Sequence, residues 1–201
     1  MNPSSLPGLA AISGEPLARR SLDASQCTLV VIDIQEKLLP AVLNREELVR
    51  NSRTLIRLAT ILEIPTLVTT QYSRGLGGTV PEIAELLPQA KTIDKMEFGC
   101  FGAEEFRTTL REASEHRTTV LLCGMESHIC VMQTALGALE NGYMVHVASD
   151  AVGSRTDWNW RVGLERMESA GCVISSTEMM MYELLRRSGT AQFKEMLPYI
   201  K

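Results

Sequence analysis

The chain of 201 residues has no excess of positive charge. Its 20 Lys and Arg are outnumbered by 24 Asp and Glu, which gives a formal net charge of −4. Proteins bind phosphate backbones through clustered Lys and Arg, so this composition argues against binding of nucleic acid through bulk charge. An acidic membrane surface would also repel the chain. We therefore expect neither nucleic acid nor a membrane as a partner.

Long apolar segments and export signals are also missing. No apolar run approaches the ~18 residues that a membrane-spanning helix needs. The first 20 residues carry no basic residue before the weakly apolar stretch "LPGLAAI", which proline and glycine interrupt. This pattern does not resemble a signal peptide. We expect a cytoplasmic protein.

Residues that could hold a metal are few and poorly spaced. The only histidines are His116, His128 and His146. The five cysteines are Cys27, Cys100, Cys123, Cys130 and Cys172. None of their spacings is typical of a zinc site, and without an export signal they indicate reduced thiols. We expect no metal and no other cofactor.

What the sequence does contain is a regular alternation of strand-like and helix-like segments. Short apolar runs rich in β-branched residues predict strands at 27–35, 65–72, 117–125, 143–152 and 172–177. Apolar residues at helical spacing predict helices at 44–64, 103–116, 127–141, 158–171 and 178–189, with a short last helix at 192–200. The alternation predicts an α/β protein with three layers, α/β/α, around a mostly parallel central sheet.

The N-terminal segment differs from the rest of the chain. Its first 25 residues hold three of the eight prolines together with repeated glycine and serine. We expect an irregular N-terminal arm over residues 1–25 and a single domain over residues 26–201. Within that domain, Asn44 is the expected N-cap of the helix at 44–64, and Gly142 is the expected cap at the end of the helix at 127–141.

Three chemically active residues lie near the ends of predicted strands. Asp33 ends the first strand, Lys95 follows a short third strand within "KTIDK" at 91–95, and Cys130 lies just beyond the fourth, at 117–125. Ligands of parallel α/β sheets bind at the carboxyl ends of the strands, so these residues can converge there. Cys130 would act as nucleophile, Asp33 as base and Lys95 as the cation that stabilises the thiolate. Read alone, Cys130 also fits a small buried core residue, and Asp33 a helix cap.

The stretch "CGMESHIC" at 123–130 interrupts a strand and delivers Cys130 into the first turn of a helix. Unpaired N–H groups and the positive end of the helix dipole favour an anion there, so we expect a lowered pKa for the Cys130 thiol. Gly124 supplies the backbone freedom for the turn, which can aim N–H groups at an oxyanion. His128 lies two positions from Cys130, a spacing that points the two side chains apart and favours a structural or surface role.

Four motifs, in order, resemble the isochorismatase-like cysteine hydrolases over residues 27 to 185. They are "VVIDIQ", "DKMEFGCF", "LLCGMESHICVMQTAL" and "GYMVHVASDAV". The last two motifs and the C-terminal "QFKEMLPYIK" look most like the isochorismatase domain-containing proteins of that superfamily. The resemblance implies an isochorismatase-like hydrolase fold and a homo-oligomer that acts on a small-molecule substrate.

The same resemblance implies roles for individual residues. It places a catalytic triad on Asp33, Lys95 and Cys130, and it gives the oxyanion to the backbone N–H groups of Glu126 and Cys130. It also implies a cis peptide bond between Met125 and Glu126. Superfamily members with nicotinamidase activity carry "DxH" after the first strand, whereas Gln35 stands at that histidine position here. This departure favours metal-free chemistry.

Three functions are compatible with these residues. We expect cleavage of a C–N amide bond through a thioester at Cys130. Some superfamily members instead cleave a vinyl ether without a thioester, and the third reading is a thiol-based sensor or interaction module without hydrolysis. Residues that follow strand ends are expected to line the substrate pocket: Gln35, Gln71, Tyr72 and Phe98. Cys100, in the loop after Lys95, is expected to have an exposed thiol that oxidation could reach.

Overall fold

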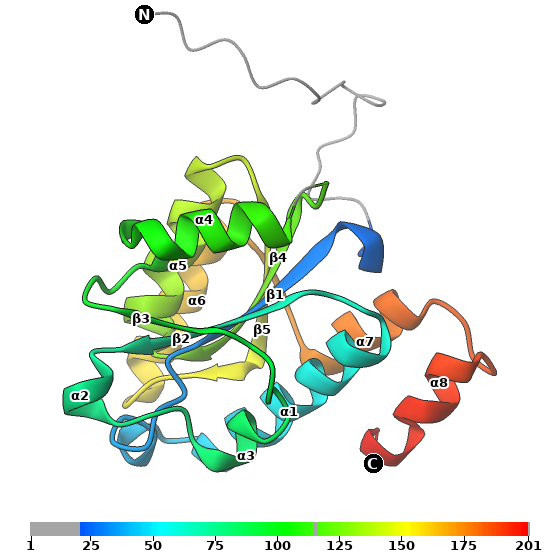
Figure 1. Cartoon of the computed structure of the whole chain (residues 1–201), viewed down its shortest axis with the longest axis horizontal. Helices are drawn as coiled ribbons and strands as arrows, with labels where there is room; N and C mark the ends of the chain where they lie inside the picture. The colour runs from blue at the N-terminus through cyan, green and yellow to red at the C-terminus, as the bar shows by residue number, and fades with distance from the viewer. Residues whose placement is uncertain (1–20, 115, 201) are drawn as a thin grey trace, which may run out of the picture.

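Six parallel strands form the central sheet of the computed structural model, which describes residues 21–114 and 116–200. Their spatial order is β3-β2-β1-β4-β5-β6 (Figure 1). The strands are β1 (Cys27–Ile32), β2 (Thr66–Gln71), β3 (Thr92–Lys95), β4 (Thr119–Met125), β5 (Met144–Gly153) and β6 (Val173–Ser175). All neighbouring pairs are parallel, so the expected α/β fold is confirmed.

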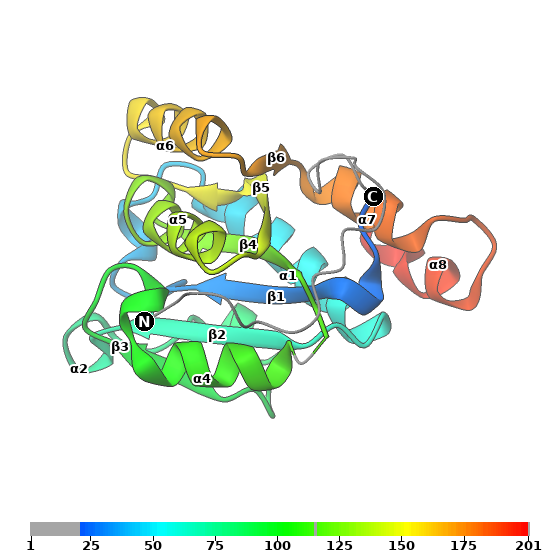
Figure 2. The same cartoon turned by 90° about the horizontal axis from the view of Figure 1, so that it is seen from above.

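Helices cover both faces of the sheet and make the other two layers (Figure 1). One face carries α1 (Arg45–Ile61), α3 (Pro81–Ala84) and α7 (Thr177–Leu185), and the other carries α4 (Glu104–Ala113), α5 (Met132–Glu140) and α6 (Asp157–Ser169). The short α2 (Ser73–Leu76) follows β2, and α8 (Ala191–Met196) lies at one end of the molecule, beyond α7 (Figure 2). Each face buries its own apolar cluster, which explains why β1 reads as a continuous apolar run.

Several helices begin and end where the sequence predicts. Gly142 follows α5 with φ of +82°, a left-handed conformation that glycine adopts at low cost. Asn44 occupies the expected N-cap position of α1, but its side chain makes no capping hydrogen bond. Two acids in the first turn, Glu46 and Glu47, instead complement the positive end of the helix dipole.

The residues just before β1 pack against α7. The Leu22 side chain is buried, and its backbone N–H donates to Oε2 of Glu183 at 3.1 Å. Nη2 of Arg186 lies 3.2 Å from Oδ2 of Asp23. We call these contacts the terminal clasp. Residues 1–20, which include most of the expected arm, lie outside the described residues, so the division of the chain at residue 25 stays a prediction.

The sheet order creates one preferred place for a ligand. From β1 the chain moves outward through β2 and β3, and β4 then returns to the other side of β1. In open α/β sheets, ligands bind at the carboxyl ends of the strands where the order reverses. That point lies between β1 and β4. In the described part of the chain, no helix is both long and apolar enough to cross a membrane.

Candidate active site

Asp33 and Cys130 flank the reversal point, and Lys95 approaches it from β3. Asp33 directly follows β1 and has φ of +51°, a left-handed conformation that is uncommon outside glycine. Lys95 is the last residue of β3 rather than the residue after it. Cys130 lies in a π-helical turn, Ser127–Val131, between β4 and α5. The structure therefore brings the three predicted residues to one edge of the sheet.

Asp33 and Lys95 form an ion pair that is closed to water. Nζ of Lys95 lies 2.6 Å from Oδ2 of Asp33, and neither side chain has exposed surface. Nζ also donates to Oε1 of Gln71 at 3.1 Å, and the Thr69 hydroxyl donates to Oδ1 of Asp33 at 2.7 Å. Burial is the largest influence on the pKa of Lys95 and would lower it, but the charge and hydrogen bond of Asp33, together with Cys100 and Cys130, raise it overall. Lys95 is therefore a permanent cation beside the carboxylate.

Cys130 is a neutral thiol in the resting structure. Burial raises its pKa, and the negative charge of Asp33 raises it further, whereas the positive charge of Lys95 acts in the opposite direction. The expected lowering of this pKa is wrong. It followed from the helix position and a nearby lysine, whereas Cys130 is 6% exposed and the charge of Asp33 opposes the thiolate. The thiol therefore lies within the electrostatic influence of Asp33, the expected base.

The segment between β4 and Cys130 has an unusual backbone. Gly124 has φ of +120°, and a Cβ atom at this position would lie 2.0 Å from the carbonyl oxygen of Ile32. The peptide bond between Met125 and Glu126 is cis, at the position that the resemblance implied. The carbonyl of Glu126 accepts hydrogen bonds from the N–H groups of Ile129 and Val131. The intervening Cys130 N–H is not one of its donors.

A loop after β5 holds this segment in place, and sequence reasoning missed it. Arg155 binds both carboxylate oxygens of Glu126 through Nε and Nη2, at 3.1 Å and 2.5 Å. The backbone N–H of Arg155 donates to the same carboxylate at 2.9 Å. The Ser154 hydroxyl lies 2.5 Å from that of Ser127 and 2.9 Å from Nδ1 of His128. Two polar residues directly after a strand, in "GSR", were the available signal.

Gln35 and Gln71, which were expected to line the pocket, use their side-chain amides to hold neighbouring residues in place rather than offering them to a ligand. Gln35 is fully buried, its Nε2 donates to the carbonyls of Gln71 and Gly77, and its Oε1 accepts from the Gln71 N–H. Gln71 is occupied by Lys95 and by the carbonyl of Met96. Both glutamines fix the end of β2 beside the ion pair.

The aromatic residues of the expected pocket lie differently. Tyr72 and Phe98 are 45% and 55% exposed. Their rings are open to solvent near the carboxyl ends of β2 and β3. Their position leaves them available to a ligand, and their contact with a substrate stays a prediction.

The remaining cysteines belong to the protein interior. Cys27, Cys123 and Cys172 lie in the apolar clusters, as expected. The expected exposure of Cys100 is wrong, because this side chain is fully buried, 3.9 Å from the Thr69 hydroxyl. Apolar packing under α5 closes the loop that holds Cys100. Burial raises the pKa of its thiol to about 11.

Metal ligands do not gather within residues 21–114 and 116–200. No group of three or more His, Cys, Asp or Glu side chains in these ranges could hold a metal ion. His128 is turned to Ser154, and His146 lies buried in β5. Gln35, which follows Asp33 by two positions, has its amide groups saturated by backbone partners.

Comparison with known proteins decides the family. The family model for the Isochorismatase domain matches residues 27–179, which spans β1 to the start of α7. The chain belongs to the isochorismatase family. Family membership makes it a hydrolase of the cysteine hydrolase superfamily, and the strand-end motifs that suggested this relation lie within the matched residues.

Two related isochorismatase-family sequences cover most of the chain. The secreted isochorismatase effector Isc1 of Phytophthora sojae is 37% identical over 96% of this chain and 93% of its own length. Isochorismatase domain-containing protein 2 of Rattus norvegicus is 35% identical over 86% of this chain and 80% of its own length. The resemblance to the domain-containing branch is therefore confirmed.

Two solved structures share the fold closely. The MAR1 ribonuclease of Caenorhabditis elegans superimposes with a TM-score of 0.83 at 36% identity, covering 90% of this chain and 92% of its own. The YcaC gene product of Escherichia coli, described as an octameric hydrolase of unknown specificity, also gives 0.83, at 25% identity, and covers 89% of this chain and 90% of its own. Both superpositions support the isochorismatase-like architecture.

Proposed function

We propose that this protein is a metal-free thiol hydrolase that cleaves a C–N amide bond of a small molecule through a thioester. The observation that carries the proposal is the buried Asp33–Lys95 ion pair, beside a Cys130 thiol whose pKa burial and the charge of Asp33 raise, at the reversal point of the sheet. Base and cation are paired before a substrate arrives, and the charges of both act on the Cys130 thiol. No histidine is needed in this arrangement.

The first half-reaction would form the thioester. Asp33 takes the proton of the Cys130 thiol as sulfur bonds to the carbonyl carbon, and the carbonyl oxygen becomes an oxyanion. The backbone N–H groups of Glu126 and Cys130 stabilise that oxyanion; loss of one such donor typically costs ~3 kcal/mol of barrier. The intermediate then collapses, the C–N bond breaks, and Asp33 returns its proton to the leaving nitrogen.

The second half-reaction would release the acid. Asp33, again a carboxylate, takes a proton from water as the water oxygen bonds to the thioester carbon. The C–S bond then breaks, and Asp33 returns the proton to sulfur, which restores the neutral thiol. Lys95 remains protonated throughout and keeps Asp33 in its orientation, which its raised pKa supports.

The names of the structural relatives suggest more than one substrate. The nematode neighbour is named a ribonuclease, but the net charge of −4 and the near-complete burial of the Cys130 thiol argue for a small molecule over RNA. Vinyl-ether cleavage on the same scaffold would proceed without a covalent adduct. A redox sensor would oxidise Cys130 without any hydrolysis.

Intact-protein mass and product formation across a panel of small amides, one vinyl ether and one RNA test the proposal. We expect an acyl adduct on the wild type and turnover that a chelator does not change. Cys130→Ala should lose at least about 10³-fold in turnover and show no adduct. Cys172→Ala, a change in a distant buried cysteine, is the matched control and should keep both.

Turnover of an amide by Cys130→Ala would contradict the thiol mechanism. Turnover of the vinyl ether alone without an adduct would replace the amide reaction by ether cleavage. Hydrolysis of RNA alone would overturn the small-molecule assignment.

A further inference from the structure

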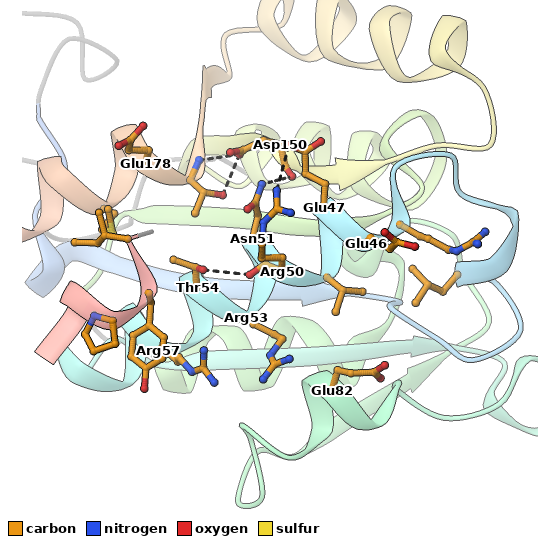
Figure 3. Close-up of a pocket in the computed structure, with 18 residues that line it drawn as sticks. Glu46, Glu47, Arg50, Asn51, Arg53, Thr54, Arg57, Glu82, Asp150 and Glu178 are labelled. Atoms are coloured by element: carbon orange, nitrogen blue, oxygen red, sulfur yellow. Dashed lines mark hydrogen bonds and ion pairs between the residues drawn. The ribbon is translucent and has the colours of Figure 1, made fainter.

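A cavity lies on the α1 face of the sheet, away from the candidate active site. It has a volume of about 790 Å³ and lies between α1, α7 and the last turn of the chain (Figure 3). Its lining includes Arg53, Arg57, Met181, Tyr199 and Ile200. Asp33, Lys95 and Cys130 do not line it. We call it the α1 groove.

Two arginines of the α1 groove have donors without acceptors. Arg53 is half-buried, and its Nε is fully buried with no hydrogen-bond partner among the described residues. The guanidinium carbon of Arg57 lies 4.1 Å from the centroid of the Tyr199 ring. This stacking uses the flat face of the guanidinium and leaves its in-plane N–H groups available. In the described ranges, neither arginine forms an ion pair.

The Arg53 and Arg57 side chains extend toward the same part of the α1 groove. They are four residues apart on α1, which places them on one face of the helix, and Figure 3 shows both extending to the same side. Like charges at this spacing repel each other, so an anion between them would remove a repulsion and supply acceptors to both. Guanidinium groups match carboxylate and phosphate oxygens through paired hydrogen bonds.

Acidic side chains of the α1 groove do not neutralise this pair. Glu47 forms an ion pair with Arg50 at 3.5 Å, and Oδ1 of Asp150 accepts from the N–H and the hydroxyl of Thr177. Figure 3 shows Glu47, Asp150 and Glu178 away from the arginine pair, on the other side of α1. Glu82 lies on the same side as Arg53, but it is exposed and makes no ion pair within the described residues.

We infer that the α1 groove is a second ligand site, which binds a small organic anion. The carboxylate or phosphate group of the ligand bridges Arg53 and Arg57, and its apolar body lies against Met181 and Ile200. The site is independent of the hydrolase proposal, because it shares no residue with the triad.

Calorimetric titration of the full chain with inorganic phosphate, benzoate and phenyl phosphate at constant ionic strength tests the inference. We expect all three to bind, with phenyl phosphate tighter than inorganic phosphate because it adds an apolar body. Arg53→Gln and Arg57→Gln should each weaken phenyl phosphate by about tenfold or more, the usual loss for a hydrogen bond to a charged group. Arg111→Gln removes the same charge from the exposed surface of α4 and should bind like the wild type.

Several outcomes would overturn the site. They are the absence of binding by any probe, equal weakening in Arg111→Gln, and equal affinity for phenyl phosphate and inorganic phosphate. Sedimentation velocity on the same samples tests whether a second copy of the chain occupies the α1 groove instead. If Arg53→Gln and Arg57→Gln change the number of subunits and no probe binds, the groove is an interface between copies of the chain. Circular dichroism confirms that each variant is folded.

Discussion

Asp33 and Lys95 carry opposite charges that are buried from water. The contribution of each residue to stability therefore depends on the presence of the other. Desolvation makes such a pair a weak source of net stability, yet removal of one partner leaves an uncompensated buried charge. If the ammonium is removed, the Asp33 carboxylate loses its ion pair and keeps the hydrogen bond from the Thr69 hydroxyl.

Lys95→Met should therefore lower the free energy of unfolding by roughly 3–5 kcal/mol in urea denaturation. The double variant Asp33→Asn/Lys95→Met should recover part of this loss, because no buried charge remains. Lys91→Met is the matched control, since Lys91 also pairs with a carboxylate, that of Glu105 at 2.5 Å, but both side chains are largely exposed. It should change stability by less than ~1 kcal/mol. Equal losses for the two lysines would contradict the buried-pair account.

Single residues also mark the limit of prediction from sequence. Asp33, Lys95 and Cys130 could be proposed because strand ends of a parallel sheet share an edge. The direction of the Cys130 pKa shift could not be predicted in this way. It depends on burial and on the distance to Asp33, and a position along a helix determines neither. The same reason explains the error for Cys100, whose loop is closed by residues distant in sequence.

At the scale of elements, the end of β4 depends on close approach between strands. Gly124 pairs with Ile32 of β1, and a β-bulge between Leu122 and Gly124 shifts the register with β5. The space for a Cβ atom at Gly124 is already filled by backbone.

Gly124→Ala should cost more than ~4 kcal/mol in unfolding free energy, because both the positive φ and the backbone collision oppose it. Gly142→Ala provides a matched comparison, since Gly142 also has a positive φ but no atom within 4 Å of the added Cβ. It should cost only about 1–2 kcal/mol. Thermal and urea unfolding of both variants measure the difference, and equal costs would mean that the collision relaxes freely.

The loop after β5 makes the turn at Glu126 sensitive to acid. Burial alone would raise the pKa of Glu126, but the hydrogen bonds and positive charge of Arg155 outweigh burial and lower it below 4.5. A lowered carboxyl pKa contributes stability above its ordinary value, and this contribution disappears as pH falls through the folded-state pKa. The contribution of the Glu126–Arg155 pair should therefore be complete at neutral pH and lost in acid.

Arg155→Gln should be less stable than the wild type at pH 7, and the difference should shrink between about pH 5 and pH 3. Urea denaturation at several pH values measures it. Arg161→Gln, on the exposed side of α6, is the control and should show no such convergence. A difference that stays constant down to pH 3 would show that Glu126 is not the titrating group.

The predicted elements and the observed ones agree because both faces of the sheet are covered, which leaves long apolar runs in the strands and apolar spacing in the helices. The π-helical turn of Cys130 and the contact of Ser154 with Ser127 were not predictable in this way. The Ser154–Ser127 contact joins residues 27 positions apart and leaves no local periodicity, and the π-helical turn spans only five residues.

For the whole molecule, we expect association into a homo-oligomer. The E. coli neighbour is described as octameric, and α6 exposes Trp158 and Val162, at 69% and 40%, one helical turn apart. Exposed apolar side chains that share a helix face favour a subunit contact. Analytical ultracentrifugation should give a mass that is a multiple of 22.2 kDa. Trp158→Glu should lower that mass if α6 forms the contact, and a wild-type mass of one chain would contradict association.

The location of the molecule in the cell stays a prediction. We predict the cytoplasm, whereas the P. sojae relative is named as secreted. Fractionation of cells that produce the full chain would distinguish the two compartments.

The terminal clasp has a consequence for how the chain is made. Leu22 is among the first described residues to leave the ribosome, and its partner Glu183 follows 161 residues later. The central strand β1 also cannot complete its pairing until β4 has been synthesised, since Cys27 pairs with Thr119. The nascent chain can thus complete neither its sheet nor its closure until translation is almost finished, so its apolar strands need protection during most of their synthesis.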